Sequence, residues 1–212
     1  MKLQATLSFL VLLLSNIVTG QINYGVKAGI TLSDQYKKIN PPGYPAENLE
    51  TKILPGFEAG VFLKHHLNDK LSLAAELNYS LIGSKTKYTR TDFIVNPDGS
   101  ISGPTTGYYN DKIQRIEIPL FLQYNLDKFY LALGPAIGIK LSSKISHYQN
   151  SSFKSAYYRP LDLGAGAIMG YPVCKKMDLT LKYNFGFTDA DNRDYSIIKN
   201  RVLTFSVLYS LK

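Results

Sequence analysis

Apolar and polar residues alternate with a period of two along most of this chain. From Ile22 to Ser33, every second residue is apolar, and the residues between are polar or very small. A strand with two different faces produces this pattern, because successive side chains point to opposite sides of a β-sheet. The pattern returns seven more times, and no helical periodicity competes with it. The eight expected strands cover residues 22–33, 56–64, 71–81, 115–124, 131–141, 161–171, 179–187 and 203–211.

The connections between these strands are alternately short and long. Tight turns are expected at His66–Lys70, Asn125–Lys128 and Val173–Lys176. The other links are much longer and cover residues 34–50, 83–111, 142–160 and 189–200. This layout is typical of outer-membrane barrels, in which short turns face the periplasm and long loops face outward. An even number of strands places both ends of the barrel chain on the periplasmic side.

Two kinds of eight-stranded barrel fit the alternation, and they differ in which face is inside. A soluble lipocalin-like barrel turns its apolar face inward, whereas a transmembrane barrel turns that face toward lipid. Glycine and alanine are frequent on the polar parity, which suits a crowded interior and would weaken a solvated strand. Tyrosines cluster toward the strand ends, as an interfacial girdle requires. They are Tyr24, Tyr79, Tyr124, Tyr171, Tyr183 and Tyr209.

We therefore predict an all-β fold, an eight-stranded antiparallel up-and-down transmembrane β-barrel, with a soluble lipocalin-like carrier as the alternative. Mean hydropathy is −0.09, which argues against a helical membrane protein. The first twenty residues predict a secretory signal peptide, because Lys2 precedes an apolar run, Leu7–Leu14, that is too short to span a bilayer. We expect cleavage near Gly20–Gln21, which leaves residues 21–212 as the barrel domain in a bacterial outer membrane.

Charged residues of both signs share the inward-facing parity of the expected barrel. An eight-stranded barrel is only wide enough for its own side chains, so these charges must pair with one another. We expect a salt-bridged plug in preference to a proton or ion path, and the narrow interior argues against an open pore. The predicted interior network comprises Lys27, Glu58, Glu76, Arg115, Glu117, Lys140, Asp162 and Lys182.

The third long link is basic. It carries Lys144, Lys154 and Arg159, and no acidic residue lies between Ser142 and Pro160. Outer-leaflet glycolipids carry phosphates, so we expect these three residues to contact lipid phosphates, with ordinary surface charge as the alternative. The net charge of the chain is +8, but acids and bases mix throughout, and no nucleic-acid partner is expected.

The sequence offers little catalytic or metal-binding chemistry. His65 and His66 are adjacent, so on a strand they point to opposite faces and cannot chelate one ion together. A single cysteine, Cys174, excludes an internal disulfide framework and a multi-cysteine zinc site. His147 lies among the serines of the third link, which leaves a lipid A esterase-like, lipid-modifying enzyme as an alternative. We predict a non-enzymatic protein with no cofactor and no metal.

Several strand sequences resemble the PorT-like outer-membrane β-barrel family common in Bacteroidetes. The most specific piece is Ile116–Tyr124, followed by Gly134–Pro135. The other matching pieces are Tyr24–Ile30, Pro55–Phe62 and Leu71–Ser80. The resemblance implies an outer-membrane barrel whose partners are membrane lipids and, as for the family's namesake, a protein-secretion or surface-export assembly. Exposed loops carry function in such barrels. Residues 89–95, which are expected to extend the third strand above the membrane, suit the docking of a partner.

Overall fold

The computed structural model describes most of the chain. The expected signal peptide and its cleavage site at Gly20–Gln21 lie outside the described residues, as does His147. Within the described part of the chain, no helix is long and apolar enough to cross a membrane. The described residues are 22–40, 42–43, 47–90, 94–95, 100–103, 105–146, 152–154, 158–191 and 196–212.

Eight long strands form the body of the structure, and five short strands lie among the long connections. The long strands are β1 (Ile22–Ile39), β4 (Leu54–His66), β5 (Leu71–Arg90), β8 (Thr105–Asn125), β9 (Tyr130–Ser146), β11 (Leu161–Cys174), β12 (Met177–Gly186) and β13 (Ser196–Ser210). The short strands are β2 (Glu47–Asn48), β3 (Thr51–Lys52), β6 (Ile94–Val95), β7 (Ile101–Ser102) and β10 (Ser152–Lys154).

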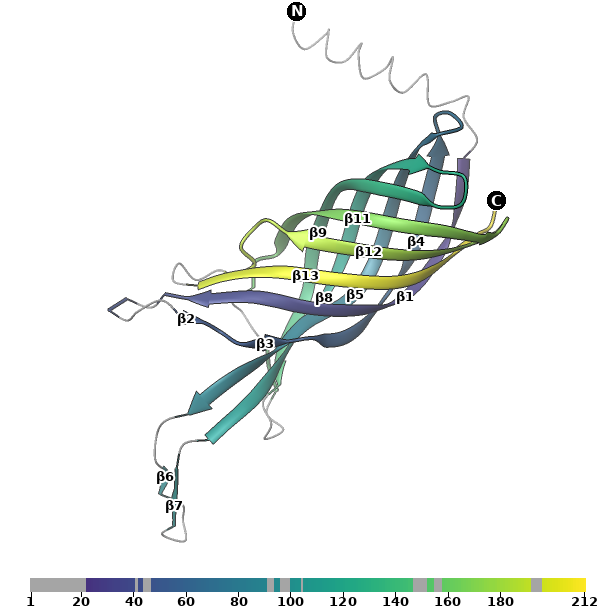
Figure 1. Ribbon diagram of the computed structural model, residues 1–212. Coiled ribbons are helices and arrows are strands. Elements are labelled where there is room, and N and C mark those ends of the chain that lie inside the picture. Colours follow the sequence, from purple (N-terminus) through teal and green to yellow (C-terminus); the bar gives the residue numbers. More distant parts are fainter. Residues whose placement is uncertain are drawn as a thin grey trace, which may run out of the picture.

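The eight long strands close into an antiparallel, up-and-down barrel (Figure 1). Each strand pairs with the next along the chain, and β13 pairs back with β1 along most of both strands. If the register is followed once around the barrel from Ile22, it returns to β1 at Leu32, ten residues further along. This stagger tilts the strands against the barrel axis. The predicted fold is confirmed.

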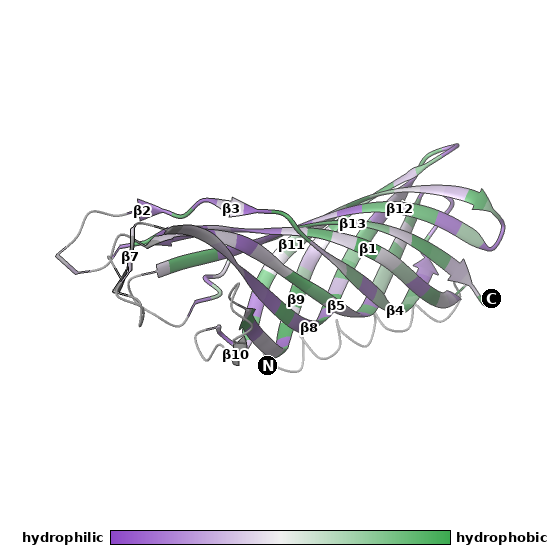
Figure 2. Cartoon of the chain, turned by 90° about the horizontal axis from the view of Figure 1, so that it is seen from below, coloured by the Kyte–Doolittle hydropathy of each residue, from purple (hydrophilic) through white to green (hydrophobic). Residues whose placement is uncertain are grey.

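The apolar parity faces outward and the polar parity faces inward. Ile30 is 62% exposed and Leu133 is 67% exposed, whereas Thr31 and Lys182 are fully buried. Figure 2 shows hydrophobic and hydrophilic positions alternating along the barrel strands. A lipocalin-like barrel requires the opposite arrangement, so the soluble-carrier alternative is wrong. An apolar outer wall of this kind is stable only against lipid.

All four long links were expected to be loops, but part of each continues as strand. β1 runs to Ile39, β9 runs to Ser146 and β13 begins at Ser196. The largest extension is at β5 and β8, which continue together beyond the barrel wall to Arg90 and Thr105 (Figure 1). Above the membrane the outer face of a strand meets water instead of lipid, so apolar residues are no longer required there, and the period-two signal fades while the backbone pairing continues.

Candidate functional site

Two buried lysines and three buried carboxylates occupy the centre of the barrel interior. The Lys27 ammonium lies 2.9 Å from the Glu58 carboxylate and 2.8 Å from that of Glu76. The Lys182 ammonium lies 2.9 Å from the carboxylates of both Glu58 and Glu117. Isolated ions would be costly to bury here, and each of these charges therefore has oppositely charged partners within hydrogen-bond distance.

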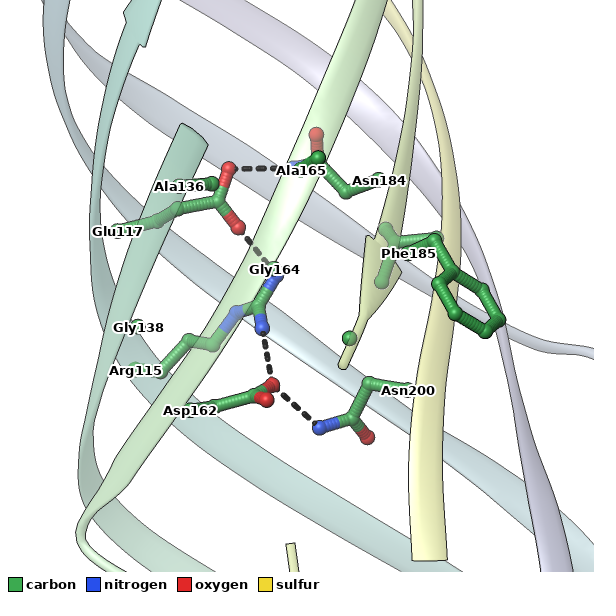
Figure 3. A pocket seen from close by; sticks show the side chains of 12 residues that line it. Arg115, Glu117, Ala136, Gly138, Asp162, Gly164, Ala165, Asn184, Phe185 and Asn200 are labelled. Atoms are coloured by element: carbon green, nitrogen blue, oxygen red, sulfur yellow. Dashed lines mark hydrogen bonds and ion pairs between the residues drawn. The ribbon is translucent and has the colours of Figure 1, made fainter. Parts of the chain in front are cut away.

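Arg115 extends this cluster toward the end of the barrel that carries the long connections. Its guanidinium pairs with Glu117 and lies 3.2 Å from Asp162 (Figure 3). Two side-chain amides complete the arrangement: Asn184 donates to Glu117 at 2.6 Å, and Asn200 donates to Asp162 at 2.8 Å. Neither asparagine was in the predicted network, although both share the inward parity of the charges. The structure brings together seven of the eight residues expected there.

Lys140 is the exception and does not join the network. The register of β8 against β9 shifts between Gln114 and Arg115, which leaves Leu141 as an extra residue in β9. At this bulge the Lys140 ammonium donates to the backbone carbonyl of Tyr158 and reaches none of the central carboxylates. Lys140 still faces the interior, where it lines a small cavity with Arg115 and Asp162, but its ammonium is engaged by the Tyr158 carbonyl, and the prediction for Lys140 was therefore wrong.

Apolar side chains also face inward, on both sides of the ionic cluster. Toward the short turns they are Phe121, Tyr130, Ala132 and Ile168. Toward the long connections they are Ile82, Ile113, Tyr158, Ala190, Ile198 and Val202. Glycines make room for the aromatic rings, because a Cβ at Gly170 would clash with Tyr130 and one at Gly166 would come within 3.0 Å of Phe121. These apolar layers were not predicted. Their strand residues are apolar exceptions at the inward-facing positions, most of which are polar or small.

Little space remains beside the central charges. Arg115 and Asp162 line two cavities of about 10 and 20 Å³. A cavity of this size has room for about one water molecule. The ionic cluster is therefore enclosed by its own side chains, as a plug requires.

His65 and His66 point to opposite faces of β4. The His66 ring contacts the Ser72 hydroxyl at 2.9 Å and the Asn23 amide at 3.3 Å at the short-turn end of the interior. No group of three or more His, Cys, Asp or Glu side chains suited to a metal ion occurs among the described residues. The alternative of an esterase, in which His147 acts with a serine of the third link, depends on a histidine that lies outside the described part of the chain.

The three basic residues of the third link do not lie together. Lys144 is exposed in β9, where its register partners are Lys112 in β8 and Lys154 in β10. Arg159 lies apart from them, beside the fourth long link, where its Nε donates to the Asp191 carbonyl at 2.7 Å. This link was expected to be a loop. Its pairing with β8, which places Lys112 beside Lys144, was therefore not predicted.

The extension of β5 and β8 carries aromatic and charged side chains on both faces. Tyr88 and Tyr109 pack with ring centroids 6.3 Å apart. On the other face, the Lys52 ammonium lies 4.5 Å from the centroid of the Tyr108 ring. We call residues 85–90 of β5 and 105–110 of β8 the projection. None of its tyrosines was predicted as a site residue, and the only sequence signal was their density in an expected loop.

An ion pair ties the projection to the first long connection. The Lys87 ammonium lies 2.7 Å from the Glu50 carboxylate, and the Lys87 backbone N–H donates to the Glu50 carbonyl at 2.9 Å. The hydrogen bond from Lys87, with its positive charge, lowers the pKa of Glu50 below its usual value. The same hydrogen bond raises the pKa of Lys87. Both side chains are solvent-exposed, so the pair contributes orientation more than stability.

Exposed tyrosines ring the short-turn end of the apolar wall. They are Tyr24, Tyr124, Tyr171 and Tyr209. Tyr79 and Tyr183 lie nearer the other edge, where the Tyr79 ring packs against Phe57 with centroids 5.9 Å apart. Tyrosine suits a membrane interface because its ring is apolar and its hydroxyl is polar. A closed barrel with an apolar wall, tyrosines at its edges and an ion-paired interior defines an integral outer-membrane β-barrel protein.

The chain belongs to the family described as "Outer membrane protein beta-barrel domain", whose model matches residues 14–192. The fold and the family together place the protein in the bacterial outer membrane. A search of curated protein sequences found no match.

Solved outer-membrane barrels share the fold at low sequence identity. The outer membrane protein OprG from Pseudomonas aeruginosa is 12% identical, with a TM-score of 0.51, and the match covers 91% of this chain and 97% of that one. Neisserial surface protein A is 12% identical with a TM-score of 0.47, and the match covers 88% and 96% of the two chains. The outer membrane protease OmpT from Escherichia coli is 12% identical with a TM-score of 0.42, and the match covers 91% and 97%.

Proposed function

We propose that this protein is a non-enzymatic outer-membrane barrel that binds a protein partner through its projection. The observation that carries the proposal is the continuation of β5 and β8 beyond the barrel wall, paired in register as far as Arg90 and Thr105. Pairing of this length orders the backbone before any partner arrives, which reduces the entropic cost of binding. Because side chains fill the interior, we infer that the binding site lies on the outside of the barrel.

The side chains of the projection suit protein recognition. Tyr108 lies on its outer face, opposite Lys87 in the register and under the Lys52 ammonium. Tyrosine is enriched at protein interfaces because it offers a large, rigid contact area together with a hydroxyl that hydrogen-bonds. We infer that Tyr108 and its basic neighbours form the contact surface, and that an acidic or aromatic patch on the partner faces them.

The described interior chemistry supports a non-enzymatic role. The central carboxylates and cations are engaged with one another and are buried. Among the described residues, the Ser–His contact is that of Ser72 with His66. Ser72 is fully buried, and the second ring nitrogen of His66 faces the Asn23 amide and no carboxylate. A hydrolytic serine needs a base that a third group orients, and it needs access to substrate.

We further propose that the partner belongs to a protein-export assembly. The support is the resemblance of the strand sequences, Ile116–Tyr124 above all, to the PorT-like barrels of Bacteroidetes. The projection would then serve as the docking element through which the barrel joins that assembly at the cell surface.

Photo-crosslinking in intact cells tests this function. A benzophenone amino acid replaces Thr106 on the projection, and a matched control carries it at Lys128 in a periplasmic turn. A second variant replaces residues 88–107 with Asn-Gly, because Lys87 and Tyr108 are register partners that a two-residue turn can join, and it also carries Tyr108→Ala to remove the inferred contact residue. We expect a discrete protein adduct at position 106, its absence at position 128, and a folded barrel in the shortened variant that has lost the partner.

Adducts that are absent at position 106, or identical at the two positions, would contradict binding through the projection. A specific partner with no role in export would support the binding function and contradict the assignment to an export assembly.

A further inference from the structure

Four lysines lie side by side on one face of the sheet formed by β3, β5, β8 and β9. Lys52 is the register partner of Lys85, and Lys112 is the register partner of Lys144. Lys112 itself lies opposite Gly83, two residues from Lys85, so the two pairs are diagonal neighbours. Directly opposed residues share a face and lie within a few ångströms of each other. We call these four residues the lysine band.

The lysine band faces away from the barrel interior. Lys112 stands between Asp111 and Ile113, both of which are buried inside. Lys85 stands between Ser84 and Thr86, which are also buried. Because side chains alternate along a strand, both lysines and their register partners lie on the outer face.

No acidic side chain among the described residues forms an ion pair with any member of the band. The acid nearest in sequence to Lys52, Glu50, is paired with Lys87 at 2.7 Å. Like charges directly opposite one another destabilise a sheet. A bound anion would relieve this repulsion, and two opposed lysine pairs offer several donors to one multiply charged group.

The height of the band matches the headgroup layer of the membrane. The last apolar residues on the outer face are Leu81 in β5, Ile116 in β8 and Leu141 in β9. The lysines of these strands follow three or four residues further along, about 10–13 Å at ~3.3 Å per residue. With a strand tilt of about 45°, this distance corresponds to roughly 7–9 Å above the hydrocarbon. Lysine stems also reach several ångströms along an apolar surface toward charge.

We propose that the lysine band binds the phosphate groups of a phosphorylated glycolipid in the outer leaflet of the same membrane. The apolar wall directly below the band would contact the acyl chains of that lipid, which distinguishes it from a soluble anion. The backbone register places Lys154 opposite Lys144 at the edge of the band, whereas Arg159 is not part of it. The band overlaps the projection at Lys85, and its Lys52 also contacts the Tyr108 ring. Lipid binding is measured with the purified barrel and no protein partner, so its result does not depend on the proposed protein contact.

Binding of lipid A by the purified full-length barrel tests the proposal. The barrel is held in phosphatidylcholine nanodiscs, and diphosphorylated lipid A is titrated in. The test variant is K52Q/K85Q/K112Q/K144Q. The matched control is K70Q/K128Q/K175Q/K176Q, which removes four exposed lysines from the periplasmic turns. We expect the test variant to bind about tenfold more weakly or worse, and the control to stay within about twofold of the unsubstituted barrel.

Two further measurements separate the sources of the anion. Dephosphorylated lipid A should bind the unsubstituted barrel as weakly as the test variant binds lipid A, and inorganic phosphate at millimolar concentration should not displace the lipid. A K52R/K85R/K112R/K144R variant should retain binding, which guards against loss of folding in the glutamine variant. Equal affinity of the test variant and the unsubstituted barrel would overturn the proposal. So would binding that ignores the lipid phosphates, or displacement by free phosphate.

Discussion

Lys182 is the residue on which the interior charges converge. Its ammonium lies 2.9 Å from the carboxylates of Glu58 and Glu117 and 3.9 Å from that of Glu76, and its side chain is fully buried. Removing one partner of a buried ion pair leaves the other charge buried and uncompensated, which costs more than the pair contributes when intact.

We therefore predict that Lys182→Met strongly destabilises the barrel, because three carboxylates lose a shared cation. The expected loss in the free energy of unfolding is about 3–5 kcal/mol. Urea titration of the barrel in lipid vesicles measures it, with the mobility of unheated samples on gels reporting the folded fraction. Lys175→Met, in an exposed turn, serves as the control and should change stability by less than about 0.5 kcal/mol. Similar stabilities for the two variants would contradict an interior held by ion pairs.

Parity along the strands was enough to predict most of the interior network, because every second residue of a barrel strand faces inward. It was not enough for Lys140, because the carbonyl that engages its ammonium belongs to Tyr158, in a long link that has no period-two signature. Nor was it enough for Asn184 and Asn200, because an amide on the inner face carries no charge that demands a partner. The ion pairs can be predicted from the charges of the inward-facing residues. The amide hydrogen bonds to the same carboxylates depend on the register of the strands, which the sequence does not give.

At the level of the strand, β9 shows what the sequence can and cannot predict. Its outward residues from Leu131 to Leu141 form the apolar stripe from which the strand was predicted. Its last residues, up to Ser146, lie beyond that stripe and were expected to be loop. The membrane imposes the alternation, so the sequence marks the part of a strand that lies in lipid and is silent about the part that lies in water.

Ile137, near the middle of the apolar stripe of β9, gives a direct test of this strand's environment. It is 41% exposed, so in water Ile137→Arg would cost almost nothing. Against lipid at the membrane midplane the same change should cost about 2–4 kcal/mol in the free energy of unfolding. The comparison is Thr106→Arg on the projection, which should be neutral. A tolerated arginine at position 137 would mean that β9 does not face hydrocarbon.

For the whole molecule, the closed barrel encloses an ionic cluster between two apolar layers. The layer toward the long connections includes Tyr158 and Ala190, which precede and follow strands β11 and β12 and still pack inside. Long links carry no periodicity, so their entry into the interior was not predictable from sequence. The closed ring, by contrast, followed from eight alternating segments, because only closure satisfies every strand edge within a membrane.

The central claim is that the apolar face meets lipid while the inner face is packed with the chain's own side chains. The chain contains no tryptophan, so single tryptophans report without background. Fluorescence quenching by lipids brominated along the acyl chain would be measured for Ile137→Trp on the outer wall and for Phe121→Trp in the interior. We predict strong quenching at position 137 and none at position 121. Quenching at position 121, or its absence at position 137, would contradict the account.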